Sequence, residues 1–237
     1  IAASYSGDGQ FGSANALAVP HTVTDSPKLR LPSASSGDGR GFGGEADFGA
    51  GAWSRDGRYY VFATEQRWLV PEDDNDLIDV FLLDRRLGLI RRLSAPTGGG
   101  SANNDSVNPT ISGNGRYAAF LTYASNLFPG DTNGAGDVVV VDLDSGSLEV
   151  ASVSSSGTLG NEAAFSPSLS DDGKWVVFHS RASNLVAADT NTQSDVFLRD
   201  RVGLQTRRIS VTSAGAEANG GTTGSLGARI SADGRYV

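Results

Sequence analysis

The strongest constraint on the fold is a block of sequence that recurs every 58 residues. It reads SRDGRYYVF at 54–62, SGNGRYAAF at 112–120 and SDDGKWVVF at 170–178, and a shorter copy, SADGRYV, stands at 231–237. A second block keeps the same interval and places Asp73, Asp131 and Asp189 at equivalent positions. A period of this length indicates one structural unit per copy.

Each copy contains four short runs that are typical of strands. In the middle copy they lie around 110–112, 116–122, 137–142 and 148–154. The runs are rich in β-branched and aromatic residues, Gly, Asn, Asp and Ser separate them, and helical periodicity is absent. Four antiparallel strands in a repeat of about 58 residues predict an all-β fold, a β-propeller of four-stranded blades. Phe62, Phe120 and Phe178 are expected to be equivalent buried positions.

The repeat resembles a known class. The pattern S-x-D-G-R-Y-V-x-F, followed by A-S-N-L-x-x-x-D-T-N-x-x-x-D-V-F-x-R-D, resembles TolB-type (WD-repeat-like) β-propeller repeats over about 48–237, and more weakly over the first 47 residues. This resemblance implies an exported bacterial protein, periplasmic or extracellular. Propellers of this kind serve as scaffolds, ligand platforms or non-catalytic partners of peptidase domains, so the resemblance is specific for fold and not for function.

The phase of the repeat divides the chain into blades at 48–107, 108–165 and 166–223. Residues 1–47 fit a degenerate partial blade, and 224–237 fit the first strands of a further or ring-closing blade. When the repeats are aligned, both ends of the sequence lie within the expected second strand of a repeat, whereas domain boundaries usually lie in exposed linkers. The expected organisation is therefore a window on a longer array, with a closed four-bladed ring as the competing arrangement.

Composition argues against several partners and cofactors. The formal net charge is −8 and no cluster of Lys and Arg exceeds a pair, so nucleic acid is not expected as a partner. Strongly apolar runs span four or five residues, against roughly 20 for a spanning helix, so no transmembrane segment is expected. Because cysteine is absent, disulfides, thiolate nucleophiles and cysteine-based metal centres are excluded.

Catalytic chemistry is sparse in this sequence. The two histidines, His21 and His179, have no metal-binding spacing, and the sequence contains no Gly-x-Ser-x-Gly elbow and no phosphate-binding loop. His179 alternates with Val177 along a second strand and is expected to be a packed core residue rather than a base. The sequence therefore predicts a chain without enzymatic activity and, calcium aside, without a cofactor.

The candidate binding element is the loop Asp-x-Asn-x-x-x-Asp, which occurs once in each full repeat. Its oxygen-bearing side chains are Asp73, Asn75 and Asp79; Asp131, Asn133 and Asp137; and Asp189, Asn191 and Asp195. Oxygen ligands at alternate positions suit calcium. Counted from the first Asp, however, positions seven to twelve are predicted to be an extended strand, so the twelfth residue lies too far from the first to bind the same ion. A turn lock, in which Asp and Asn bond local backbone N–H groups, is therefore favoured over a calcium site.

The first of these loops concentrates acid. Five carboxylates lie within eight residues, on Glu72, Asp73, Asp74, Asp76 and Asp79. Such a cluster needs solvation or a cation, so this loop is the strongest calcium candidate of the three. Trp68 precedes it, and tryptophan beside carboxylates suits a protein or carbohydrate surface.

Arginine pairs at 91–92 and 207–208 lie in the fourth run of two repeats. They are interpreted as charges that protect an edge strand, with an anion site as the alternative.

Two functional classes fit the sequence. The leading hypothesis is a non-enzymatic exported β-propeller that acts as a rigid protein-interaction or ligand-binding scaffold. The alternative is the propeller portion of a larger hydrolase, a peptidase or a glycan-active enzyme, whose catalytic domain lies outside this sequence.

Overall fold

The computed structural model describes residues 4–5, 14–15, 51–218 and 227–237, and the chain divides into two compact units, 1–36 and 37–237. In the first unit, β1 (Ser4–Tyr5) pairs antiparallel with β2 (Ala14–Asn15). The degenerate partial blade expected at 1–47 otherwise lies outside the described residues, as does His21.

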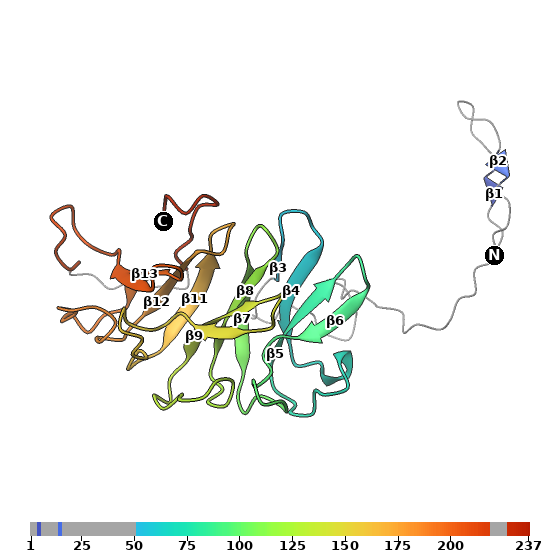
Figure 1. The fold of residues 1–237 in the computed structure, drawn as a ribbon, viewed down its shortest axis with the longest axis horizontal. Helices are drawn as coiled ribbons and strands as arrows, with labels where there is room; N and C mark the ends of the chain where they lie inside the picture. Colours follow the sequence, from blue (N-terminus) through green and yellow to red (C-terminus); the bar gives the residue numbers. More distant parts are fainter. Residues whose placement is uncertain (1–3, 6–13, 16–50, 219–226) are drawn as a thin grey trace, which may run out of the picture. The chain divides into compact units, whose positions relative to one another are not determined.

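Three four-stranded antiparallel sheets form the second unit, one for each full repeat (Figure 1). In the first sheet the strands are β3 (Ala52–Trp53), β4 (Tyr59–Thr64), β5 (Asp79–Asp84) and β6 (Leu89–Arg92), with the 3-10 turn η1 (Arg67–Leu69) after β4. The second sheet has β7 (Ser106–Ile111), β8 (Tyr117–Thr122), β9 (Asp137–Asp142) and β10 (Leu148–Val150). In the third sheet they are β11 (Ala164–Leu169), β12 (Trp175–Ser180), β13 (Asp195–Asp200) and β14 (Gln205–Arg208). Strands neighbouring in sequence are neighbours in each sheet, which is the order of a propeller blade.

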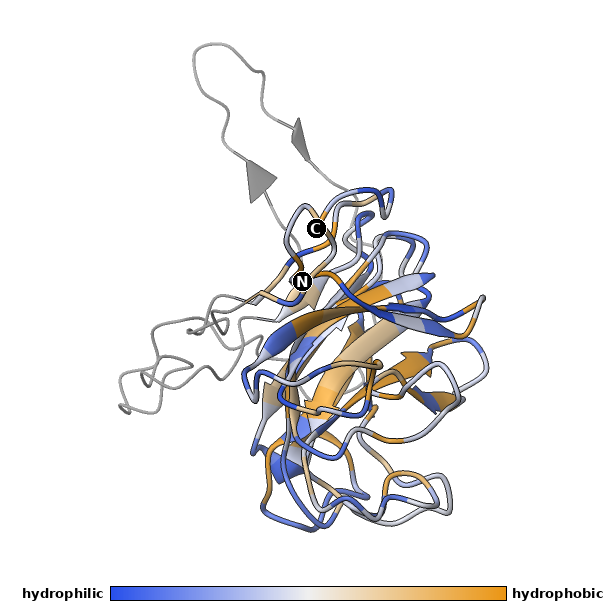
Figure 2. Ribbon diagram, turned by 90° about the vertical axis from the view of Figure 1, so that its left-hand side faces the viewer, coloured by the Kyte–Doolittle hydropathy of each residue, from blue (hydrophilic) through white to orange (hydrophobic). Residues whose placement is uncertain are grey.

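The hydrophobic core lies between the sheets. One cluster joins Val61 and Leu82 of the first sheet to Phe120 of the second, and another joins Val140 of the second sheet to Phe178 of the third. The two middle strands of each sheet bury apolar residues on both faces. Figure 2 shows strands of the second unit with hydrophobic residues along them. No helix among the described residues is long and apolar enough to cross a membrane.

Phe62, Phe120 and Phe178 occupy the same register position in the three sheets. Each lies opposite the third residue of the following strand, and their exposed fractions are 8%, 0% and 0%. The prediction that they are equivalent buried residues is confirmed.

The first strands of the second and third sheets begin two residues earlier than the blade boundaries expected at 107/108 and 165/166. Asn-Pro and Ser-Pro suggest a break there, but the strands continue through a β-bulge. Asn108 and Ser166 adopt φ angles of 54° and 51°, which accommodate the extra residues without ending the ladder. The fourth strand of the second sheet ends at Val150, because Ala151 and Ser152 both bond the Val138 carbonyl.

The Ser-x-Asp/Asn-Gly turns join the first and second strands. In the first sheet the Gly57 N–H donates to the Ser54 carbonyl at 2.9 Å, and the Asp56 carboxylate accepts from the Ser54 hydroxyl at 2.6 Å. Gly57 has a φ of 67°, and the equivalent Gly115, Gly173 and Gly234 have φ of 72°, 68° and 72°. Glycine adopts this positive φ without the steric cost that a side chain brings.

The fourth copy of this turn, around Gly234, is formed like the others. Residues 227–237 nevertheless form no strand with the described residues, although strands were expected over 224–237. The turn glycine is followed by Arg235, Tyr236 and Val237.

Successive turns bond to each other. The Arg55 N–H donates to the Gly113 carbonyl at 3.0 Å, and the Asn114 N–H donates to the Asp171 carbonyl at 2.9 Å. Three of the turn glycines also pack on the aromatic ring that follows the preceding turn: Gly115 on Tyr59, Gly173 on Tyr117 and Gly234 on Trp175. These contacts fix the spacing of the sheets at this end.

We expect Gly115→Ala to lower the free energy of unfolding by about 2–3 kcal/mol, because the new Cβ adds a clash to a left-handed backbone. A Cβ there stands 2.9 Å from the Tyr59 ring and 3.3 Å from Ser54 Cβ. Gly146→Ala is the matched control, since Gly146 has a φ of 74° with no atom within 4 Å of the Cβ position. Urea denaturation should give a loss of only about 1 kcal/mol for the control. Equal losses would show that the packing between turns contributes nothing.

Candidate functional site

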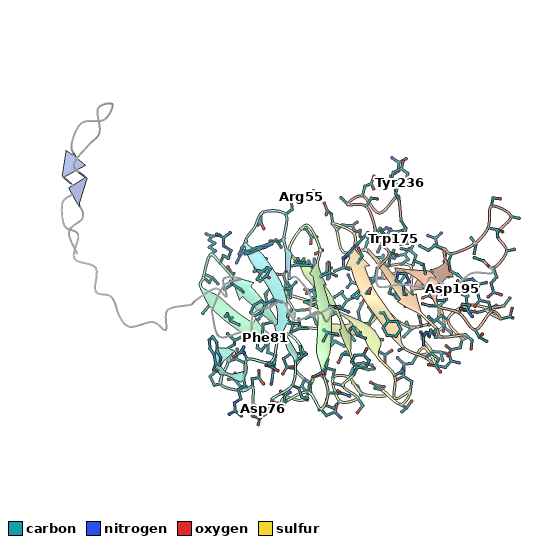
Figure 3. All side chains as sticks on the ribbon, turned by 180° about the vertical axis from the view of Figure 1, so that it is seen from behind. Arg55, Asp76, Phe81, Trp175, Asp195 and Tyr236 are labelled. Atoms are coloured by element: carbon teal, nitrogen blue, oxygen red, sulfur yellow. The ribbon has the colours of Figure 1, made fainter. Side chains whose placement is uncertain are left out.

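The Asp-x-Asn loops connect the second strand of each sheet to the third. They lie at the end of the sheets opposite the glycine turns, as Asp76 and Arg55 show in Figure 3. The last aspartate of each loop, Asp79, Asp137 or Asp195, is the first residue of the third strand and is no more than 1% exposed. The nine predicted residues thus lie in three separate clusters, one in each repeat, and each cluster contains a buried aspartate.

Three serines hold the buried aspartates, and the sequence analysis did not identify them. Ser152 donates to Asp137 Oδ1 at 2.6 Å and accepts the Val138 N–H at 3.2 Å. Ser94 makes the same two contacts with Asp79 and Val80 in the first repeat, and Ser210 makes them with Asp195 and Val196 in the third. The signal was present, because these serines keep the 58-residue spacing.

The loop asparagines stabilise the turns. Asn133 Oδ1 accepts the Ala135 N–H at 2.9 Å, and its Nδ2 donates to the Gly160 carbonyl at 2.9 Å. Asn75 and Asn191 make equivalent bonds in the other repeats. Each asparagine thus bonds its own turn and the loop after the fourth strand, as a turn lock does.

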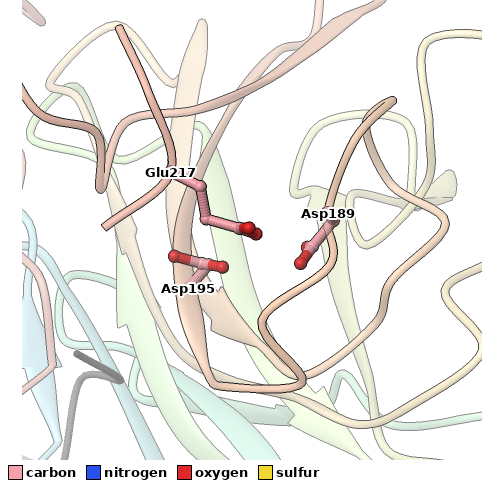
Figure 4. A group of neighbouring side chains, drawn as sticks. All are labelled: Asp189, Asp195 and Glu217. Atoms are coloured by element: carbon pink, nitrogen blue, oxygen red, sulfur yellow. The ribbon is translucent and has the colours of Figure 1, made fainter. Parts of the chain in front are cut away.

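An arginine lies within the acidic cluster of the third repeat. The carboxylates of Asp189, Asp195 and Glu217 have oxygens within 4.8 Å of one another (Figure 4). Arg208 Nη1 contacts them at 3.3, 3.4 and 2.6 Å respectively, and its side chain is 9% exposed. The guanidinium is therefore the counter-ion of a group of carboxylates that otherwise has the arrangement of a metal site.

The carboxylates of this cluster differ in acidity. Hydrogen bonds, first of all from the Thr190 backbone N–H, lower the pKa of Glu217 to about 2. Burial raises the pKa of Asp189, and the nearby charge of Asp195 adds to that effect. Glu217 consequently remains ionised in the cluster over the whole neutral and mildly acidic range.

We expect Glu217→Gln to destabilise the fold at neutral pH and to have a vanishing effect in acid. The pKa of Glu217 falls from 4.5 to about 2 on folding, so its contribution is complete above about pH 4.5 and is lost as pH falls toward 2. An NMR titration of the Glu217 carboxyl should therefore have its midpoint near 2. Glu162→Gln, at an exposed position in the preceding repeat, controls for the loss of one charge. A Glu217 midpoint near 4.5 would contradict the assignment.

Arg92 has the same place in the first repeat. Its Nη1 lies 3.3 Å from Asp73 and 3.4 Å from Asp79, and its Nη2 donates to the carbonyls of Glu72 and Gly100. The Arg92 side chain is 4% exposed, so the loop expected to be the strongest calcium candidate already contains a buried cation. The interpretation of Arg92 and Arg208 as edge protection is therefore wrong, because both point inward.

The second repeat has no arginine at this position. Arg92 pairs with Phe81 in the first sheet, and Arg208 pairs with Phe197 in the third. The equivalent pair in the second sheet is Val150 with Val139, so a valine has the position of the two arginines. Asp131 and Asp137 remain, and burial raises the pKa of both carboxyls.

The loop after the second strand also distinguishes the first repeat. In the later repeats Asn126 and Asn184 bond the backbone of the preceding repeat, at Ser101 and Leu159. Trp68 takes this position in the first repeat, within η1, and is 69% exposed. The sequence analysis singled out Trp68, but only the structure shows that it is presented to solvent.

His179 is 8% exposed, and burial lowers its pKa. Its Nε2 accepts the Ala228 N–H at 2.7 Å. This agrees with the prediction of a packed core residue.

No protein-family profile and no curated protein sequence matches the chain. Among solved structures, the chain is similar to TolB from Acinetobacter baumannii, at 17% identity and a TM-score of 0.45, over 78% of this chain and 35% of that one. It is also similar to a putative TolB from Agrobacterium tumefaciens, at 20% identity and a TM-score of 0.43, over 69% and 50% of the two chains.

A third similar structure is the β-propeller domain of the Trilobed protease from Pyrococcus furiosus, at 12% identity and a TM-score of 0.41, over 67% of this chain and 40% of that one. The chain thus spans a third to a half of the matched TolB structures. The strand order and register of the three sheets are those of four-stranded propeller blades.

Proposed function

We propose that this chain is a non-enzymatic, exported β-propeller that acts as a rigid scaffold for a protein partner, in the periplasm or outside the cell. The observation that carries the proposal is the loop 65–78, which presents Trp68 beside exposed acidic side chains. These exposed carboxylates belong to Glu65, Glu72, Asp74 and Asp76.

Rigidity of the loop supports this role. Its buried part is held by Arg92 and by the Asn75 bonds to Leu77 and Ala102. The exposed indole donates to Gln66 at 2.7 Å, and Arg67 pairs with Asp76 at 2.9 Å. A surface that is already ordered loses little conformational entropy when it binds.

The chemistry of the surface points to a basic partner. Tryptophan is enriched among residues that dominate binding energy, and acidic side chains around it attract Lys and Arg. We therefore expect binding to weaken as salt is added, because exposed charges are screened within about 10 Å at 0.1 M ionic strength.

A photocrosslinking experiment tests the proposal. p-Benzoylphenylalanine is placed at position 68 or at position 87, where Leu87 is 61% exposed on the hairpin at the opposite end of the first sheet. In cells of the source organism, position 68 should crosslink one defined protein with a basic surface, and position 87 should not. Combined Glu72→Gln, Asp74→Asn and Asp76→Asn substitutions should reduce the crosslink at least fivefold. Equal crosslinking at both positions, or none at 68, would contradict the proposal.

The non-enzymatic part of the proposal has a separate test. The purified chain should show no turnover of ester, peptide or glycoside substrates, with or without added calcium. Activity that disappears in a His179→Ala variant that still folds would contradict it.

A further inference from the structure

The three clusters each contain two equivalent loop aspartates, and they differ in the positive charge that lies between those aspartates. In the first and third repeats a guanidinium contacts both loop aspartates at 3.3–3.4 Å. In the second repeat Val150 is too short and too apolar to replace it. Ser101 and Glu217 accept hydrogen bonds from Arg92 and Arg208, and the equivalent position in the second repeat is Leu159. The second repeat therefore lacks both the cation and its additional acceptor.

The two aspartates of the second repeat nevertheless remain. Asp137 is 1% exposed and is held by Ser152 and Asn133, neither of which carries a charge. Asp131 Oδ1 is buried and has no hydrogen-bond partner among the described residues. Two neighbouring carboxylates in such a place are costly unless a positive charge or a proton joins them.

The geometry points to a cation site in the second repeat: a calcium ion bound by Asp131 and Asp137 takes the place that the arginine guanidinium has in the first and third repeats. The sister repeats show that these loops hold a positive charge between their two aspartates. The unpartnered Asp131 oxygen supplies an acceptor for it.

A third ligand follows from the same equivalence. Arg92 and Arg208 both donate to the carbonyl of the residue before the loop aspartate, in Glu72 and Ala188. The equivalent carbonyl in the second repeat belongs to Gly130. The ligands are then all oxygens, which hard cations such as calcium prefer, and water completes the coordination. Asn133 supports the site as a neighbour, because its amide accepts the Ala135 N–H and donates to Asp137 and to the Gly160 carbonyl.

Calorimetric titration of the chain with calcium chloride tests the site. We expect one calcium per chain, no comparable heat with magnesium or sodium, and at least a tenfold weaker affinity in Asp137→Asn. Asp144→Asn is the matched control, because it removes one charge from an exposed residue of the same repeat and should leave the affinity unchanged.

The most discriminating variant is Val150→Arg, which installs the arginine of the sister repeats. It should abolish calcium binding and raise the melting temperature in the absence of calcium. The reverse change, Arg208→Val, should create a second calcium site. Calcium binding that persists in Val150→Arg, or the absence of calcium binding to the folded wild-type chain, would overturn the proposal.

Discussion

Replacing Arg92 with methionine should lower the free energy of unfolding by about 3–5 kcal/mol, the cost of removing one partner of a buried ion pair. Methionine keeps much of the side-chain volume but leaves Asp73 and Asp79 without their counter-ion. Arg86→Met is the matched control, because Arg86 is exposed on the hairpin after β5. Urea denaturation at pH 7 should show a loss of less than about 0.5 kcal/mol for the control.

The pH dependence of this loss identifies its cause. Burial raises the pKa of Asp79, and Arg92 opposes that increase, so the pKa rises further in Arg92→Met. An acid with a raised pKa binds more protons in the folded state, and the fold therefore gains stability as pH falls. The deficit relative to wild type should shrink as pH falls through the raised pKa of Asp79 toward 3.8. A deficit that is constant with pH would contradict the electrostatic explanation.

Phe120→Ala should lower the free energy of unfolding by about 3–5 kcal/mol, as large-to-small changes of fully buried aromatic residues do. Phe120 is 0% exposed and packs in the core between the first and second sheets, with Val61 and Val139. Leu87→Ala, at an exposed hairpin position, should change stability by less than about 0.5 kcal/mol. Similar losses for the two variants would show that the contact between the sheets does not stabilise the chain.

The repeat made the blades predictable because turn glycines and buried aromatics are required locally in each copy. Gly57, Gly115 and Gly173 need a positive φ wherever the turn forms, whatever surrounds it. Phe62, Phe120 and Phe178 are likewise buried in each copy, since the middle strands are covered on both faces.

The direction of the arginines could not be predicted in the same way. Adjacent residues of a strand point to opposite faces, so one of Arg91 and Arg92 must point inward, and the pair alone does not say which. The structure directs Arg92 to the aspartates and Arg91 to the Leu143 carbonyl of the next repeat. A signal did exist, because the repeat places Val150 at the position of Arg92 and Arg208, and valine indicates an inward position.

The bulges were missed for a different reason. Proline after Asn108 and Ser166 normally disfavours a continuous ladder. The first run expected in the second repeat, 110–112, begins later than the observed strand, which starts at Ser106. Pairing on both sides of the bulge keeps the strand in the sheet, and such pairing depends on residues 7 to 16 positions away along the chain.

A crystal structure of the chain grown with calcium, with anomalous differences collected, tests most directly whether each repeat closes its loop around one positive charge. We predict the guanidinium groups of Arg92 and Arg208 between the aspartates of the first and third repeats, and one anomalous peak between Asp131 and Asp137 in the second. Arginines directed to solvent, or an anomalous peak in the first loop and none in the second, would contradict it.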